Sequence, residues 1–350
     1  DVQVSAAVET AYVEHAPIEP EAGCAWMDGD VLVVSACTQA PVMDQEDTAK
    51  LLGLPLARVR IIPATAGGGF GTKLDVSLQP LLGLAVLKTG RPCRMVYSRQ
   101  ESMISTTKRH PAAMRGQLAA TRDGRLAGMV FEGAFNTGAY ASWGPTVATR
   151  VPIHASGPYN VPHYLAEAHA IHTNGPVSGA FRGFGVPQAT ILQEVLMDRL
   201  ARELGMDRLA FRRMNALGDG DRTVCGQQLH GVGIAECLDA LAPVWQAAQA
   251  RAAAFNANAN ANADANAHGG ARRRGVGVAS CWYGCGNTAL PNPSTIRLGI
   301  TADGRLRLHQ GATDIGQGSN TVITQICADA LGMPLADFEL VGPDLSLIHI

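Results

Sequence analysis

The chain lacks the features that mark membrane-bound, secreted or nucleic-acid-binding proteins. No apolar run reaches the roughly 18–20 residues that a membrane helix requires. Residues 1–4 do not form a basic segment followed by an apolar core, so no signal peptide is predicted. The 28 basic and 30 acidic residues nearly cancel, which is unlike a nucleic-acid-binding surface or an acidic disordered tail. We therefore expect a cytoplasmic protein with no nucleic-acid partner and no membrane partner.

Grouped metal ligands are also missing. The eight cysteines are scattered, and Cys281 and Cys285 form a close pair with no second pair to complete a cluster. The ten histidines form no ligand set of familiar spacing. We expect free thiols, no metal-binding side chain, and no iron–sulfur cluster in this chain.

The length of 350 residues and the 47% of hydrophobic residues favour two domains, each with its own core. Residues 256–266 alternate Asn and Ala and offer no side chains for a core, so we predict a solvated, disordered loop over about 254–271. An Ala-rich helix is predicted before it, over 234–253. The alternating elements predict an α+β fold with mixed sheets and packed helices, with domains at 1–220 and 221–343.

Three glycine-rich segments each follow strand-like sequence or precede a predicted helix. Residues 67–71 lie between a strand at 59–62 and a helix at 78–88, residues 183–185 precede Pro187 and a helix, and residues 316–318 lie between a strand at 306–309 and a helix at 322–331. Glycine allows close approach of the backbone to a ligand, and a helix start offers unpaired N–H groups. Together the three loops indicate one extended anionic ligand.

The loops do not match the common nucleotide motifs. Residues 71–73 read Gly-Thr-Lys rather than the Gly-Lys-Ser/Thr of a phosphate-binding loop, and none of the three completes G-x-G-x-x-G. For any one loop taken singly, a purely structural turn remains the alternative.

Several segments in family order resemble the molybdenum hydroxylases of the xanthine dehydrogenase and aldehyde oxidase type. They are residues 15–21 (HAPIEPE), Thr38-Gln39, residues 67–73 (GGGFGTK), 138–140 (GAY), 180–188 (AFRGFGVPQ) and 311–318 (GATDIGQG). The resemblance covers almost the whole chain, and the second and third glycine loops are its most specific parts. It implies two molybdopterin-binding domains, the second of them incomplete.

The resemblance also implies which residues contact a molybdenum–molybdopterin cofactor, either as such or with a dinucleotide extension. The backbone of Gly69, Phe70 and Gly71 would line the metal site. The pterin would be bound by two further segments, Ala180-Phe181-Arg182 and Gly316-Gln317-Gly318. Arg182 suits this role because a guanidinium presents a planar set of donors to an anionic, oxygen-rich ligand. No protein side chain would bind the metal, since the pterin dithiolene does so.

Three residues match positions close to the reacting groups in the family. Gln39 would lie near the metal's oxo ligand, Phe184 would stack on a flat substrate, and Arg150 would pair with a substrate oxygen. Arg150 as an ordinary surface arginine remains an alternative. Leu74 stands where xanthine oxidisers carry a glutamate, and near Gly286, where the second stacking aromatic is expected, the chain offers only Trp282 and Tyr283 a few residues earlier. Both departures argue against purine specificity.

The resemblance implies the subunit of an enzyme that hydroxylates a purine-like N-heterocycle or an aldehyde with water-derived oxygen. Iron–sulfur and FAD subunits are expected as partners in a hetero-oligomer, together with a small-molecule substrate. Two alternatives remain: a carbon monoxide dehydrogenase-type or other molybdopterin large subunit, and a non-catalytic truncated fragment. The family's catalytic glutamate is expected beyond residue 350, so this chain alone is expected to be inactive, and residues 344–350 are expected to be a non-native tail.

Overall fold

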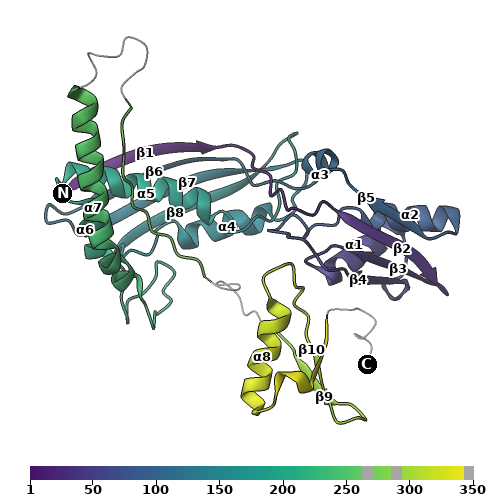
Figure 1. Cartoon of the computed structure of the whole chain (residues 1–350). Coiled ribbons are helices and arrows are strands. Elements are labelled where there is room, and N and C mark those ends of the chain that lie inside the picture. Colours follow the sequence, from purple (N-terminus) through teal and green to yellow (C-terminus); the bar gives the residue numbers. More distant parts are fainter. Residues whose placement is uncertain (262–271, 285–293, 343–350) are drawn as a thin grey trace.

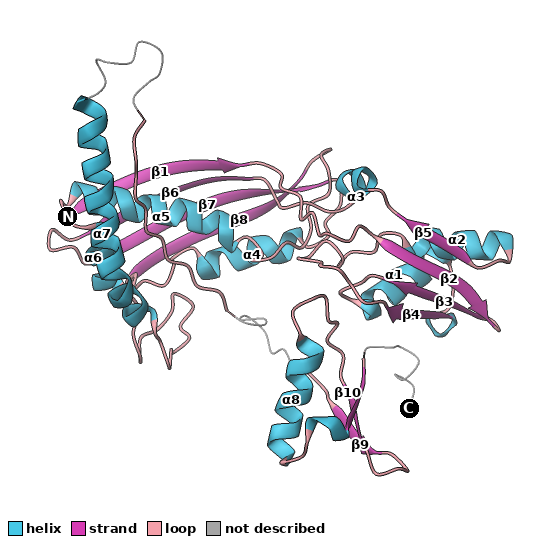
Figure 2. Cartoon of the chain, in the orientation of Figure 1, coloured by secondary structure: helices cyan, strands magenta, loops and turns pink. Residues whose placement is uncertain are grey.

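The computed structural model describes residues 1–261, 272–284 and 294–342, and within them helices pack on three mixed β-sheets (Figure 2). Each sheet contains at least one parallel and one antiparallel pair of strands. The predicted α+β class is therefore confirmed. The expected tail at 344–350 and the position of Gly286 lie outside the described residues.

The first sheet is built from four strands in the order β4-β3-β2-β5. Helices α1 and α2 pack on it, and Leu32, Ile61 and Leu82 are among the fully buried side chains of the shared core. The elements of this part are β2 (Ala22–Asp28), β3 (Val31–Ala36), α1 (Pro41–Leu52), the 3-10 turn η1 (Leu56–Arg58), β4 (Val59–Pro63), α2 (Gln79–Thr89) and β5 (Cys93–Val96).

The second sheet also has four strands, which are longer than those of the first, in the order β1-β6-β7-β8. Helices α4 and α5 lie on one face of it (Figure 1), and Phe131, Phe135 and Leu192 belong to the large core between them. The elements are β1 (Val2–Thr10), α3 (Arg99–Ser105), β6 (Ala112–Ala120), β7 (Leu126–Gly138), α4 (Gly144–His154), β8 (His163–His172) and α5 (Val186–Glu203). The helix predicted after Pro187 is thus present, with Gly185 as its N-cap.

The opposite face of this sheet is uncovered by other described elements. Exposed residues alternate with buried ones along β6 and β7, as in a sheet with one solvated face. A hollow of about 570 Å³ on this face is lined by residues such as Gln117, Val130 and Leu165. None of the predicted site residues lies there, so this hollow is not the candidate site.

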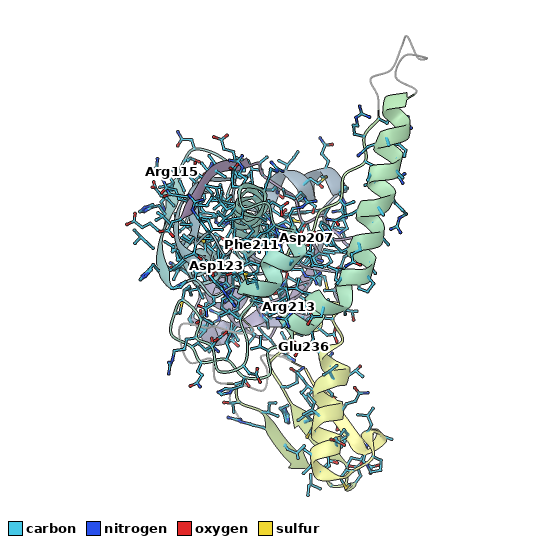
Figure 3. The ribbon with its side chains drawn as sticks, turned by 90° about the vertical axis from the view of Figure 1, so that its left-hand side faces the viewer. Arg115, Asp123, Asp207, Phe211, Arg213 and Glu236 are labelled. Atoms are coloured by element: carbon cyan, nitrogen blue, oxygen red, sulfur yellow. The ribbon has the colours of Figure 1, made fainter. Side chains whose placement is uncertain are left out.

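Helices α6 (Arg208–Asn215) and α7 (Ile234–Ala261) close the far end of the second sheet. Asp207 caps α6 and also accepts a hydrogen bond from Trp245 of α7 at 2.8 Å, and Arg213 pairs with Asp239 at 2.8 Å. Figure 3 shows Phe211 pointing into this packed region and Arg213 lying near the start of α7. Buried Arg212 joins α6 to α5 through Glu194 at 2.6 Å.

Helix α7 extends further than the sequence suggested. It runs to Ala261, so the first part of the loop predicted over 254–271 is helical, and the remainder lies outside the described residues. The prediction placed too much weight on the low complexity, because alanine has the highest intrinsic helix propensity and asparagine can be accommodated in a helix. Asn256 is also used directly: its amide binds the backbone N–H and carbonyl of Arg274 at 2.8 and 2.9 Å.

A smaller unit follows, in which α8 packs on a three-stranded sheet of order β11-β10-β9. Its elements are β9 (Arg297–Ile300), β10 (Leu306–His309), α8 (Ser319–Leu331), the 3-10 turn η3 (Leu335–Asp337) and β11 (Phe338–Val341). The loop from β10 to α8, which holds the third glycine segment, lies at the end of this unit nearest the rest of the molecule (Figure 1).

None of the helices in the described residues is long and apolar enough to cross a membrane.

Candidate functional site

The first and second glycine loops lie directly against each other between the two larger sheets. The backbone N–H of Arg182 donates to the carbonyl of Phe70 at 2.9 Å. Gly71 has a φ of +112°, and a Cβ added to it would lie 2.4 Å from the carbonyl oxygen of Ala180. Only glycine allows this approach, so the two loops form one surface because residue 71 has no side chain.

The side chain of Gln39 packs against the first glycine loop. Its Oε1 accepts the N–H of Gly71 at 2.9 Å, and the backbone N–H of Gln39 donates to the carbonyl of Lys73 at 2.8 Å. A Cβ on Gly69 would lie only 2.3 Å from that Oε1. The structure therefore brings Gln39, Gly69, Phe70, Gly71 and the Ala180–Arg182 segment together.

The first loop does not lead directly into a helix. Turns occupy residues 70–74, and α2 begins only at Gln79, so the predicted loop-to-helix device applies to the second and third loops but not to the first. The first loop is instead bound to the segment that contains Glu19: buried Lys73 pairs with Glu19 at 2.6 Å, and the same carboxylate accepts the N–H of Gly67 at 2.7 Å.

Backbone strain is concentrated around this site. Within the described part of the chain, four non-glycine residues have positive φ: Ala16, Phe70, Ser142 and Phe184. Phe70 and Phe184 belong to the two loops, and Ser142 precedes α4. Such conformations cost about 1–3 kcal/mol each and persist where surrounding contacts enforce them.

Two residues to which the sequence analysis gave no role, His15 and Arg109, hold the second loop. The ring of Phe181 stacks on His15 (3.9 Å between centroids) and also lies 3.8 Å from the guanidinium carbon of Arg109. His15 Nε2 donates to the carbonyl of Ala180 at 2.7 Å, and Arg109 Nη2 donates to the carbonyl of Arg182 at 2.8 Å. We call His15, Phe181 and Arg109 the Phe181 clamp. Burial lowers the pKa of His15 to about 4, so the clamp histidine is neutral near pH 7.

Arg182 itself presents its side chain outward from this fixed backbone. The residue is exposed, and among the described residues its guanidinium has no carboxylate or carbonyl partner. An unpaired guanidinium next to a helix N-terminus, that of α5, provides positive potential and free donors in one place. This arrangement fits an anionic, oxygen-rich ligand.

On the other side of the second loop, Trp143 at the start of α4 contacts Phe184. The ring of Trp143 lies edge-on to that of Phe184 with 5.8 Å between centroids. Ser142, just before, donates to both oxygens of Asp75 at 2.9 and 3.0 Å, which ties α4 to the first loop. Arg150 lies two turns further along α4, where its guanidinium is 4.4 Å from the ring of Tyr283.

The third loop is organised by its own side chains. The carboxylate of Asp314 accepts the N–H groups of Gly316, Gly318 and Asn320, and these contacts hold its pKa below the usual range. The amide of Gln317 is also engaged within the loop, accepting from Ile315 at 2.7 Å and donating to the carbonyl of Thr313 at 2.8 Å. Gly316, Gln317 and Gly318 therefore lie in the smaller unit as a preformed turn.

Behind Gln39, α1 carries a buried carboxyl group whose ionisation is disfavoured. Burial raises the pKa of Asp44 to about 7, although its Oδ2 accepts a hydrogen bond from Gln79 at 2.8 Å. Between pH 4 and 7 the folded protein therefore retains a proton that the unfolded chain has lost, so this group reduces stability as pH rises through that window.

We expect Asp44→Asn to gain stability relative to the wild type as pH rises from 4 to 7, because the amide never ionises. The gain should approach about 3–4 kcal/mol, the value of roughly three pKa units. Urea unfolding at several pH values measures it. A stability difference between the two proteins that stays constant over this window would contradict the prediction.

Comparison with known proteins decides the family. Two models of the molybdopterin cofactor-binding domain match the chain, one over residues 1–216 and one over residues 248–349. The chain belongs to the molybdopterin-binding subunits of the molybdenum hydroxylases. The resemblance seen in the sequence is thereby confirmed.

Individual relatives agree with this membership. The chain is 45% identical over 241 residues to the nicotinate dehydrogenase large molybdopterin subunit of Eubacterium barkeri, a match that covers 68% of this chain and 57% of the relative. It is 33% identical over 348 residues to the xanthine dehydrogenase molybdenum-binding subunit of Escherichia coli O157:H7, which covers 98% of this chain and 44% of the relative. The chain thus spans about half the length of these curated relatives.

A solved structure supports the fold. The aldehyde oxidoreductase of Desulfovibrio desulfuricans superimposes with a TM-score of 0.86 at 27% identity, covering 99% of this chain and 37% of that one. The described residues contain no group of three or more His, Cys, Asp or Glu side chains that could hold a metal ion. Gly69 and Gly71, where a Cβ would clash with neighbouring atoms, and the exposed guanidinium of Arg182 fit the molybdopterin cofactor.

Proposed function

We propose that the chain binds the molybdenum–molybdopterin cofactor with its glycine loops and serves in the hydroxylation of an N-heterocycle. The observation that carries the proposal is the docking of residues 67–73 onto residues 180–185, beside the start of α5, with the Arg182 guanidinium exposed and without a carboxylate or carbonyl partner in the described part of the chain. Arg182 and the backbone of Gly69, Phe70 and Gly71 would hold the cofactor. The bound cofactor would supply two-electron redox chemistry and an oxygen derived from water.

The residues of this chain would position the cofactor. Gln39 would direct its amide nitrogen toward the metal's oxygen ligands, because its Oε1 is already used by Gly71. Gly316, Gln317 and Gly318 would contact the pterin from the smaller unit, and the hydrogen bonds that Asp314 and the Gln317 amide make within the loop would hold that turn in shape. Partner subunits with iron–sulfur clusters and FAD would accept the electrons in a hetero-oligomer, which we place in the cytoplasm. We also propose that the two molybdopterin-binding domains of this chain span residues 1–220 and 221–343.

A heterocyclic substrate is favoured over an aldehyde by the α4 side of the site. Phe184 and Trp143 offer aromatic surface for a flat ring, and Arg150 offers a cation that can pair with an oxygen substituent and stabilise negative charge as it develops. Leu74 is apolar and provides no carboxylate to read a purine. The similarity to a nicotinate dehydrogenase subunit supports a pyridine ring that bears an anionic group.

The proposal is tested with the complete enzyme, purified with its partner subunits, by comparing turnover of pyridine carboxylates, purines and aldehydes in ¹⁸O-labelled water. We expect label to enter the heterocyclic product, and Arg150→Met to lower kcat/KM for the carboxylate by about 100-fold while aldehydes change little. Preferred turnover of aldehydes, unaffected by Arg150→Met, would favour an aldehyde oxidase role instead.

A structure of a carbon monoxide dehydrogenase shares the fold at 22% identity, which does not favour that activity.

A further inference from the structure

The segment 282–284 contacts α4 where the helix carries Arg150. The backbone carbonyl of Gly284 accepts a hydrogen bond from the Arg150 guanidinium, and the ring of Tyr283 lies 4.4 Å from the guanidinium carbon. Segment and helix lie far apart in the sequence, so tertiary contacts alone hold them together.

His154, one turn after Arg150, makes the most defined of these contacts. Residues four apart lie on the same face of a helix, so both side chains meet the same segment. The N–H of Gly284 donates to His154 Nε2 at 3.0 Å, and His154 Nδ1 lies 2.9 Å from the carbonyl of Arg150. The ring also stacks on Tyr283 (5.6 Å, 20°) and contacts Trp282 at 4.9 Å between centroids.

These partners determine the tautomer of His154. A carbonyl can only accept, so Nδ1 carries the proton, and an amide N–H can only donate, so Nε2 must be unprotonated. The neutral ring satisfies both contacts, whereas an imidazolium would direct a second donor at the Gly284 N–H. The side chain is 2% exposed, and burial lowers its pKa, with the positive charge of Arg150 acting in the same direction.

The groups that face this ring come from α4 and from the segment: Arg150 lies on α4 itself, and Trp282 and Tyr283 come from the segment. From β8, which also packs on α4, Tyr164 donates to the carbonyl of Pro152 at 2.6 Å. Arg150 is the charged group that acts on His154. A carboxylate that would favour the protonated ring is not found among them.

We propose that His154 is a positioning residue that holds Tyr283 and Gly284 against Arg150 and thereby sets the direction of the arginine's guanidinium. The arginine then has one preferred orientation, because an aromatic ring and a carbonyl each occupy part of its surface. This inference rests on the proposed role of Arg150 toward an oxygen-bearing substrate.

Two substitutions at His154 distinguish the hydrogen bond from Gly284 from the stacking of the aromatic ring. His154→Phe keeps a ring of similar size for stacking but removes the acceptor for Gly284. His154→Gln keeps an acceptor near the position of Nε2 and loses the ring. His169→Gln, on the exposed strand β8, is the matched control for loss of an imidazole.

The complete enzyme is assayed in two ways. Hydrogen exchange of the Gly284 amide should accelerate by about tenfold or more in His154→Phe, and much less in His154→Gln. KM for a pyridine carboxylate should rise by about tenfold in His154→Phe with kcat and molybdenum content little changed, and His154→Gln should restore most of it. The wild-type KM should rise on acidification as His154 is protonated, and His154→Gln should lack that rise.

Unchanged Gly284 exchange in His154→Phe would overturn the inference, as would faster exchange with an unchanged KM. The proposed function fails differently. If Arg150→Met leaves KM and kcat unchanged while His154→Phe still accelerates exchange, then the contact exists and the assigned role of Arg150 is wrong.

Discussion

Replacement of Arg182 by alanine should reduce the molybdenum and pterin content of the purified complex by about tenfold or more. A charge-assisted hydrogen bond contributes about 1.5–3 kcal/mol, and this guanidinium can make more than one of them to an anionic ligand. The backbone around it should remain in place, because the Phe181 clamp holds Ala180 and Arg182 through their carbonyl groups rather than through the Arg182 side chain.

The fold itself should be almost unaffected by this change. Arg182 is exposed, and surface substitutions usually alter stability by less than about 0.5 kcal/mol. Arg202→Ala, an exposed arginine in the last turn of α5, is the control and should retain full cofactor content. Metal analysis by mass spectrometry and pterin fluorescence after release measure the effect. Full molybdenum content in Arg182→Ala would remove the main support for the cofactor assignment.

Replacement of Gly71 by alanine should separate the two loops and destabilise the protein by about 3 kcal/mol or more. Two causes act together: the φ of +112° is unfavourable for any residue with a Cβ, and that Cβ would lie 2.4 Å from the carbonyl oxygen of Ala180 and 3.0 Å from the Cα of Phe181. Both neighbouring atoms belong to the backbone, so relief requires the second loop to move away.

Gly304→Ala separates the two causes. Gly304 has a φ of +83°, and an added Cβ would meet nothing within 4 Å, so this variant carries the backbone strain alone, about 1–2 kcal/mol. Urea unfolding compares the two variants, and molybdenum content reports on the loops. Equal destabilisation by both substitutions, with cofactor content retained in Gly71→Ala, would show that the close approach of the loops is not needed.

Much of the secondary structure could be read directly from the sequence. The strand at Leu306–His309 and the helix after Pro187 were predicted at nearly their observed positions, and Gly332 ends α8 in the left-handed conformation that its residue type favours. These features depend on periodicity and turn chemistry within consecutive residues. The motif residues of the glycine loops could likewise be listed in advance, because their spacing is local.

The sequence by itself therefore determined several of the helices and strands, the glycine loops and the resemblance to a family. Only the tertiary structure decided which groups meet: His15, Arg109 and His154 act by binding backbone carbonyls and amides of distant segments, and such contacts leave no trace in local spacing. The docking of Gly71 onto Ala180 is of the same kind. The physical reason is that a backbone hydrogen-bonding group is present at almost every position, so residue identities cannot show which one a side chain will bind.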